Sequence, residues 1–160
     1  MLSETTKTRF AELIAKYPTR KSAVMPMLYL ALEERGQIYP DDIAEIAEAI
    51  GTTPTDVEAI ASFYNMYYLE PTATYVIEVC TNISCMLVGA MNIVEHLENK
   101  LGIKPGQATP DGVFMLKTAE CLGSCGTAPM MMIGDTYYEK LTPQRVDEIL
   151  DELRAKAKGG

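Results

Sequence analysis

A-E-C-L-G-S-C-G, residues 119–126, and C-T-N-I-S-C, residues 80–85, together hold all four cysteines of the chain. The spacing is Cys-x4-Cys, then 35 intervening residues, then Cys-x3-Cys. Glycine and small polar residues flank the thiols, which is typical of turns. Four soft thiolates from two turns are what an iron–sulfur cluster or a closed zinc site requires. The pattern predicts a metal centre on Cys80, Cys85, Cys121 and Cys125.

The composition is that of a globular protein. With 160 residues, 48% of them hydrophobic and 22% charged, the chain can bury a core as one domain, or as one small domain with an appended helical segment. The formal net charge of -8 argues against nucleic acid or an anionic membrane as a partner and permits a basic protein partner. No apolar run reaches the roughly 18–20 residues of a membrane helix, and residues 1–20 lack the features of a secretory signal. We expect a cytoplasmic protein without direct membrane insertion.

Residues 1–70 are predicted to be an all-helical segment, because apolar residues recur at helical spacing between capping residues. The predicted helices run from Ser3 to Tyr17, from after Ser22 to Gly36, from Pro40 to Gly51, and from Pro54 onward with Thr53 as the cap. The last two resemble a helix-turn-helix, which raises the question of DNA binding. Seven acids and no Lys or Arg lie between Asp41 and Glu70. Since a recognition helix without cations cannot hold phosphates, we expect no nucleic-acid partner.

Residues 71–160 predict an α/β domain. Thr74–Val79 and Val113–Thr118 have the β-branched, apolar character of strands, and each is followed by a cysteine turn. The other predicted elements are a helix after Cys85 that ends at Gly102, a short strand at Ile103, a hairpin of Met130–Ile133 and Thr136–Leu141, and a last helix from Pro143 capped by Thr142. This order predicts a mixed sheet flanked by helices and preceded by the helical segment.

The two cysteine turns are expected to meet at one end of the sheet, because parallel strands leave a sheet at the same edge. Cys85 is expected to precede its helix directly, so that the first N–H groups of that helix face a bound anion. No Lys or Arg lies within three residues of a cysteine, whereas Glu78 and Glu120 lie two and one residues from one. Nearby negative charge opposes reduction, so a bound cluster is expected to have a low reduction potential.

Three other uses of the cysteines stay open on spacing alone. A structural zinc site is one, although zinc ligands usually come in Cys-x2-Cys pairs. Disulfides are less expected in a reducing compartment, and thiol redox catalysis usually employs Cys-x-x-Cys. An iron–sulfur cluster is the favoured interpretation.

The motifs C-T-N-I-S-C and A-E-C-L-G-S-C-G-x-A-P resemble those of the thioredoxin-like 2Fe-2S ferredoxins, in particular the NuoE-type subunits of NADH-quinone oxidoreductase (respiratory complex I). The resemblance covers nearly the whole chain. It implies a helical bundle segment over residues 1–70 and a thioredoxin-like ferredoxin domain over residues 71–160. It also implies one 2Fe-2S cluster bound by Cys80, Cys85, Cys121 and Cys125.

The same resemblance implies a larger partner subunit that binds FMN and NADH, within a complex peripheral to the cytoplasmic membrane. Similar subunits occur in NAD-linked hydrogenases and formate dehydrogenases, so these parent complexes stay open. The chain has no G-x-G-x-x-G after a strand and no phosphate loop, which leaves the nucleotides to another chain. NADH delivers two electrons and a 2Fe-2S cluster takes one, so a flavin is needed to divide the pair. Alone, the chain is expected to carry electrons without turnover.

Pro129 resembles the proline that is cis in thioredoxin-like folds. Only about 5–6% of X-Pro bonds are cis, so a cis Ala128–Pro129 bond is a specific hypothesis.

Overall fold

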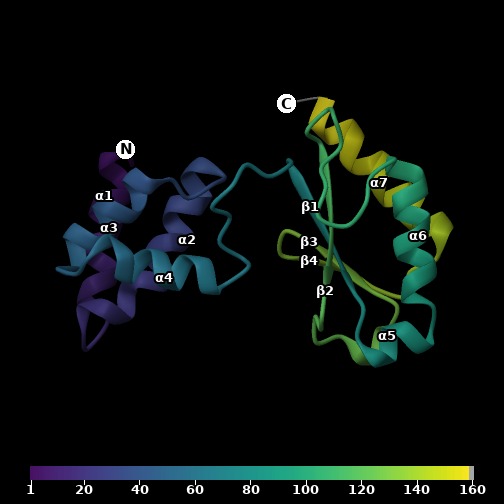
Figure 1. The fold of residues 1–160 in the computed structure, drawn as a ribbon, viewed down its shortest axis with the longest axis horizontal. Helices are drawn as coiled ribbons and strands as arrows, with labels where there is room; N and C mark the ends of the chain where they lie inside the picture. Colours follow the sequence, from purple (N-terminus) through teal and green to yellow (C-terminus); the bar gives the residue numbers. More distant parts are fainter. Residues whose placement is uncertain (159–160) are drawn as a thin grey trace. The chain divides into compact units, whose positions relative to one another are not determined.

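Capped helices build the first part of the chain. A computed structural model describes residues 1–158, and the chain divides into two units, Met1–Pro71 and Thr72–Gly160 (Figure 1). The first unit consists of α1 (Glu4–Ala15), the 3-10 helix η1 (Arg20–Ala23), α2 (Val24–Arg35), α3 (Pro40–Ile50) and α4 (Pro54–Phe63). The predicted all-helical segment is therefore confirmed.

The ends of these helices follow from their capping residues. Thr53 accepts a hydrogen bond from the N–H of Asp56 at 3.2 Å, and Asp56 accepts one from the N–H of Thr53 at 3.3 Å. This reciprocal capping box satisfies donors that the first turn of α4 leaves unpaired. Gly36 and Gly51 end α2 and α3 with φ of 70° and 75°, a left-handed conformation that glycine adopts without a steric cost.

A buried carboxylate joins α2 to α3 in this unit. The side chain of Asp42 is fully buried; it accepts a hydrogen bond from the N–H of Tyr39 at 2.9 Å and pairs with the guanidinium of Arg35. The same guanidinium lies 3.9 Å from the centre of the Tyr39 ring. Around this pair the apolar faces of the helices form one core, which includes Met27, Leu28, Ile46 and Val57.

The second unit is built on a mixed four-stranded sheet in the order β2-β1-β3-β4. Its strands are β1 (Tyr75–Cys80), β2 (Phe114–Ala119), β3 (Met131–Ile133) and β4 (Thr136–Tyr138). β1 pairs in parallel with β2 and antiparallel with β3, and β3 and β4 form the predicted hairpin. The prediction of a strand at Ile103 is wrong, because Ile103 is buried in a loop that follows α6. Its apolar side chain belongs to the core, but Pro105 and Gly106 leave no room for an extended segment after it.

Two helices cover one face of this sheet, α6 (Ala90–Leu101) and α7 (Pro143–Lys158), while the short α5 (Ile83–Leu87) lies at the end of β1 (Figure 1). Alternate residues of the strands point to the helices, so that Ile77 and Val79 share a core with Leu97 and Ile149. Among residues 1–158, none of the helices has the length and apolar character needed to cross a membrane.

Replacing Asp42 by alanine is expected to lower the free energy of unfolding by about 2–3 kcal/mol, because Arg35 and the Tyr39 N–H lose their buried acceptor. Asp41→Ala is the matched control, since Asp41 lies one position earlier in α3 and is exposed; we expect a change within about 0.5 kcal/mol there. Urea unfolding followed by circular dichroism measures both. Equal effects of the two substitutions would contradict a structural role for the buried pair.

Candidate metal centre

Both cysteine turns leave the sheet at the same edge. In the parallel pairing of β1 with β2, Cys80 lies opposite Ala119, so each strand ends at the same level. The N–H and the hydroxyl of Thr81 both donate to the carbonyl oxygen of Ala119, at 2.9 and 3.2 Å. The expected meeting of residues 80–85 with residues 121–125 is therefore confirmed.

The first turn differs from the prediction at Cys85. Instead of preceding a helix, Cys85 lies inside α5, which begins at Ile83 because the side chain of Asn82 accepts the Ile83 N–H at 2.9 Å. Gly89, with φ of 99°, then interrupts the helical path, and the long helix α6 starts only at Ala90. The periodic apolar residues had predicted one continuous helix. The break leaves α5 as a short separate turn.

The second turn is held by the β3–β4 hairpin. The exposed carboxylate of Glu139 accepts hydrogen bonds from the hydroxyls of Ser124 and Thr127, the second at 2.5 Å. The hydroxyl of Tyr137 donates to the carbonyl oxygen of Leu122 at 2.8 Å. Thus, two side chains at the end of the hairpin fix the loop that carries Cys121 and Cys125.

Glu139 and Tyr137 were absent from the residues that the sequence pointed to. The charges expected near the thiols belong to residues close to them in sequence, whereas the contact with Glu139 depends on the folding of the hairpin. The hydrogen bonds from Ser124 and Thr127 lower the pKa of Glu139 below its usual value, so this acid adds negative charge beside the turn. Like Glu78 and Glu120, it would oppose the reduction of a bound cluster.

Interactions among the thiols link all four cysteines. Cys80 and Cys85 are buried, whereas Cys121 and Cys125 are exposed, and none forms a disulfide. Burial opposes ionisation of Cys80, but N–H groups of Asn82 and Leu122 and the thiols of Cys85 and Cys121 outweigh it, so the pKa of Cys80 is lowered. Burial raises the pKa of Cys85, as do the neighbouring Cys80 and Cys125, while the Met130 N–H acts in the opposite direction.

Backbone N–H groups are directed at the sulfur atoms of Cys80, Cys85 and Cys121. Besides the amides at Asn82, Leu122 and Met130, the N–H of Gly123 donates to the sulfur of Cys121 at 3.4 Å. Met130 follows the Ala128–Pro129 bond, which is cis, as hypothesised. Such amides stabilise thiolate charge and are the kind of hydrogen bond that tunes a metal–sulfur centre.

The donor set fits an iron–sulfur cluster in chemistry and in number. No three His, Cys, Asp or Glu side chains of residues 1–158 lie close enough together to hold one metal ion. A 2Fe-2S cluster does not need such a trio, since its four thiolates are divided between two irons. The pairwise links among the four cysteines are compatible with that division.

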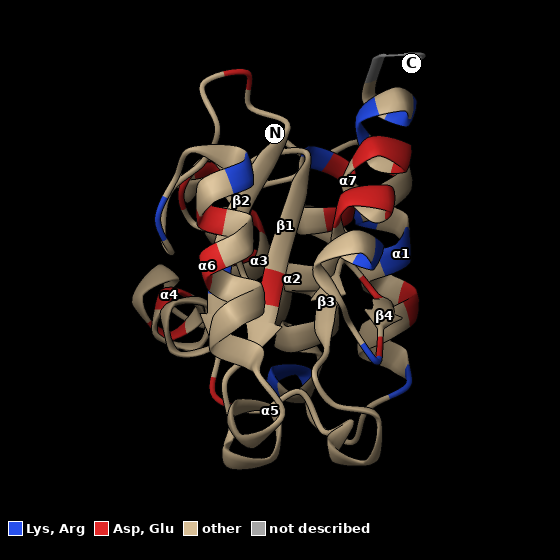
Figure 2. Cartoon of the chain, turned by 90° about the vertical axis from the view of Figure 1, so that its right-hand side faces the viewer, with Lys and Arg blue, Asp and Glu red and all other residues tan. Residues whose placement is uncertain are grey.

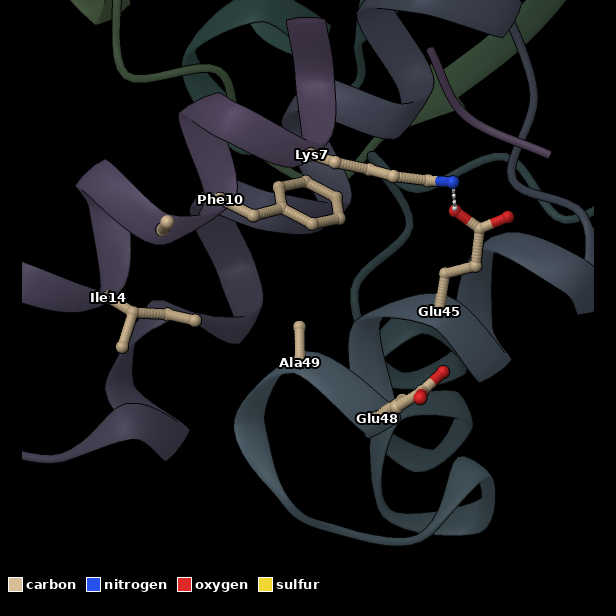
Figure 3. A pocket seen from close by; sticks show the side chains of 7 residues that line it. Lys7, Phe10, Ile14, Glu45, Glu48 and Ala49 are labelled. Atoms are coloured by element: carbon tan, nitrogen blue, oxygen red, sulfur yellow. Dashed lines mark ion pairs between the residues drawn. The ribbon is translucent and has the colours of Figure 1, made fainter. Parts of the chain in front are cut away.

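A separate hollow of about 400 Å³ lies in the first unit between α1 and α3 (Figure 3). It is lined by Lys7, Phe10, Ala11, Ile14, Glu45, Glu48 and Ala49. The ammonium group of Lys7 lies 3.6 Å from a carboxylate oxygen of Glu45. Neither cysteine nor histidine is among the residues that line this hollow.

The chain belongs to the thioredoxin-like [2Fe-2S] ferredoxin family, whose model matches residues 10–154. Among its relatives, NADH-quinone oxidoreductase subunit 2 of Thermus thermophilus is 46% identical over 90% of this chain and 81% of that protein. A subunit of the NADH-quinone oxidoreductase of Rhizobium meliloti is 42% identical over 88% of this chain and 84% of that protein. The expected NuoE-type relationship is confirmed.

A solved structure extends the comparison to another complex. The fold resembles part of an NAD+-reducing [NiFe]-hydrogenase with a TM-score of 0.73 and 25% sequence identity, over 82% of this chain. This chain spans only about a fifth of that hydrogenase chain, 22% of its length. The mixed sheet and its flanking helices thus have the predicted thioredoxin-like fold.

Replacing Glu139 by alanine is expected to loosen the second turn, because Ser124 and Thr127 lose their shared acceptor. Amide hydrogen exchange in the peptide covering residues 121–127 should become several-fold faster. Asp135→Ala, which removes an exposed acid from the β3–β4 turn, is the matched control and should leave that exchange unchanged. Glu139→Gln keeps an acceptor oxygen and should have an intermediate effect. If Glu139→Ala and Asp135→Ala gave the same exchange rates, the hydrogen bonds of Glu139 would have no role in holding the second turn.

Proposed function

We propose that this chain is an electron-transfer subunit that holds one 2Fe-2S cluster on Cys80, Cys85, Cys121 and Cys125. The observation that carries the proposal is the meeting of the two cysteine turns at one edge of the sheet, in a chain of the 2Fe-2S family. The sulfur atoms are soft donors, and the N–H groups directed at them favour the anionic form that such ligands need. When bound, the cluster accepts or releases one electron at a time.

The electron would be exchanged with the FMN of a partner subunit that oxidises NADH, within NADH-quinone oxidoreductase. Relatives named as subunits of that enzyme support this assignment. The partner takes two electrons as hydride, and the flavin passes them on singly. In this arrangement the 1–70 segment is a helical bundle and residues 71–160 form the ferredoxin domain. The chain alone would show no turnover, and its place at the cytoplasmic membrane would come through its complex.

A second parent complex is favoured by one observation, the match to an NAD+-reducing [NiFe]-hydrogenase. The equivalent subunit of an NAD-linked hydrogenase or formate dehydrogenase would hold the same cluster and exchange electrons with a flavin in the same way. The two candidates differ in the complex around the chain and not in the site.

Iron and acid-labile sulfide analysis tests the cluster. We expect a brown protein with about two irons and two sulfides per chain, whose visible absorption bleaches with dithionite. Cys121→Ser and Cys125→Ser should each lower the iron content, because a hard oxygen ligand replaces a soft thiolate. His96→Ala is the control, since His96 bonds to Asp147 on α7 at 2.9 Å, away from the thiols, and should retain the full iron content.

A colourless protein with stoichiometric zinc would instead identify a structural zinc site without redox function. Unchanged iron and sulfide in both serine variants would contradict the proposed ligand roles.

Affinity purification from the native organism tests the parent complex. We expect a flavin-containing chain that oxidises NADH to co-purify, together with further subunits of a quinone reductase. Recovery of nickel and a hydrogenase subunit would assign the chain to the second candidate. Recovery of the chain without any flavoprotein would contradict the electron-transfer role.

A further inference from the structure

The hollow between α1 and α3 exists because small side chains line part of both helices. Ala11 on α1 and Ala49 on α3 are among its lining residues, and about 400 Å³ is left unfilled there. Protein interiors are otherwise packed closely, with few voids larger than a water molecule. Ala11 is exposed, so the hollow opens to solvent. Its size is that of the clefts in which proteins bind ligands.

The lining of the hollow combines an apolar part with an acidic part. Phe10 and Ile14 lie one turn apart on α1, and Glu45 and Glu48 lie one turn apart on α3. Figure 3 shows Lys7 and Glu45 approaching each other on one side of the hollow, with Ile14 on the other side. With one cation and two carboxylates, the lining has a net charge of -1.

Glu45 has fewer hydrogen bonds than a buried carboxylate needs. Its side chain is 19% exposed, but both carboxylate oxygens are buried, and neither accepts a hydrogen bond within the part of the chain that the structure describes. The ammonium group of Lys7 lies 3.6 Å from one of these oxygens and donates instead to Glu4 at 3.3 Å. Buried carboxylates are normally satisfied by hydrogen bonds. Glu45 therefore offers an acceptor that lacks donors, in the wall of an open hollow.

Charge selects a cationic occupant for this hollow. Seven acids and no Lys or Arg lie between Asp41 and Glu70, and Figure 2 shows acidic residues and no basic ones on α4. Nucleic acid, an anionic membrane or another anionic ligand would be repelled here. A cation on an apolar stem matches both the acidic and the apolar part of the lining.

A guanidinium group fits Glu45 better than an ammonium group does. Its planar fork donates two parallel hydrogen bonds to one carboxylate, which would satisfy both oxygens of Glu45 together. Its flat face and aliphatic stem also pack well against an aromatic ring such as that of Phe10. An ammonium group is already present on Lys7, and it leaves Glu45 without a hydrogen bond.

We propose that the hollow between α1 and α3 is a docking pocket for an arginine side chain of a basic protein partner. The guanidinium pairs with Glu45, the exposed Glu48 attracts it from outside, and an apolar residue beside the arginine packs against Ile14 and Ala49. Contacts of that neighbour add to the affinity, which a bare cation would lack. The pocket lies in the first unit and uses no cysteine, so this inference goes beyond the proposed function and does not depend on it.

The test uses the full cluster-loaded chain and the blocked dipeptide acetyl-leucyl-arginine amide, whose only charge is the guanidinium. Binding is followed by amide shifts in an NMR titration. We expect saturable shifts in residues 7–14 and 45–49, with a Kd of about 1 mM or less. The citrulline analogue, which has the same shape without the charge, should bind at least about tenfold more weakly. The lysine analogue and propylguanidinium, the bare side chain, should each bind several-fold more weakly.

Substitutions in the wall of the pocket give a second readout. Glu45→Gln keeps the shape and removes the charge, whereas Ala49→Leu fills the hollow and leaves the charge unchanged. Each should raise the Kd of the arginine dipeptide by at least about tenfold. Glu12→Gln removes an exposed acid of α1 that lies outside the lining and should stay within about twofold. Circular dichroism and iron content should match the wild type in all three.

Hydrogen exchange tests whether a protein presents the arginine. Amides of residues 7–14 and 45–49 should exchange more slowly in the complex recovered by co-purification than in the isolated chain. Equal exchange there would overturn the proposal, and so would equal binding of the arginine and citrulline dipeptides or no saturable shifts up to about 10 mM. Equal binding of propylguanidinium and the dipeptide would identify a site for a small cation, against a docking pocket. A dimer that Glu45→Gln dissociates would show that a second copy supplies the arginine, also against the proposal. The proposed function survives each of these outcomes, because iron content is measured separately.

Discussion

Strand β1 pairs with β2 in parallel over all of its six residues, and the position of every cysteine depends on that pairing. Because both strands run in the same direction, the turn after Cys80 and the turn before Cys121 emerge together. The bonds from Thr81 to Ala119 then lock the two turns at the last rung of the sheet. A shift of β2 by one residue against β1 would turn the core-facing side chains of β2 to the other face and move the two turns out of level. The core and the site are therefore specified by the same contacts.

Backbone amides help the site to carry negative charge. The N–H groups of Asn82, Leu122, Gly123 and Met130 are directed at sulfur atoms, and they supply partial positive charge at fixed positions. A lysine or arginine in the same place would stabilise thiolates too, but it would also need water or a counter-ion. Amides held in place by the fold therefore stabilise thiolate charge even though the acids Glu120 and Glu139 lie beside the second turn.

Much of the fold could be predicted from the sequence, because the signals were local. The cap at Thr53 and the terminating Gly51 depend on neighbouring residues and were identified correctly. The cis bond before Pro129 had a different origin, since it was a hypothesis drawn from the resemblance to thioredoxin-like folds, and it is present. The path of the chain after Cys85 was predicted wrongly, as one continuous helix. Apolar periodicity records where large apolar side chains recur, but it does not say whether each of them faces a core or is exposed, as Leu87 is. The contact of Glu139 with the second turn was equally hidden, since it exists only once the hairpin has formed.

Two of the four thiols are buried and two are exposed, which gives the site an inner and an outer side. Reagents arriving from solvent meet Cys121 and Cys125 first, on the turn that Glu139 holds. Cys80 and Cys85 are almost inaccessible to solvent. A thiol-modifying reagent is therefore expected to label the chain in two stages, first at the outer pair and then, only after the turns have opened, at the inner pair.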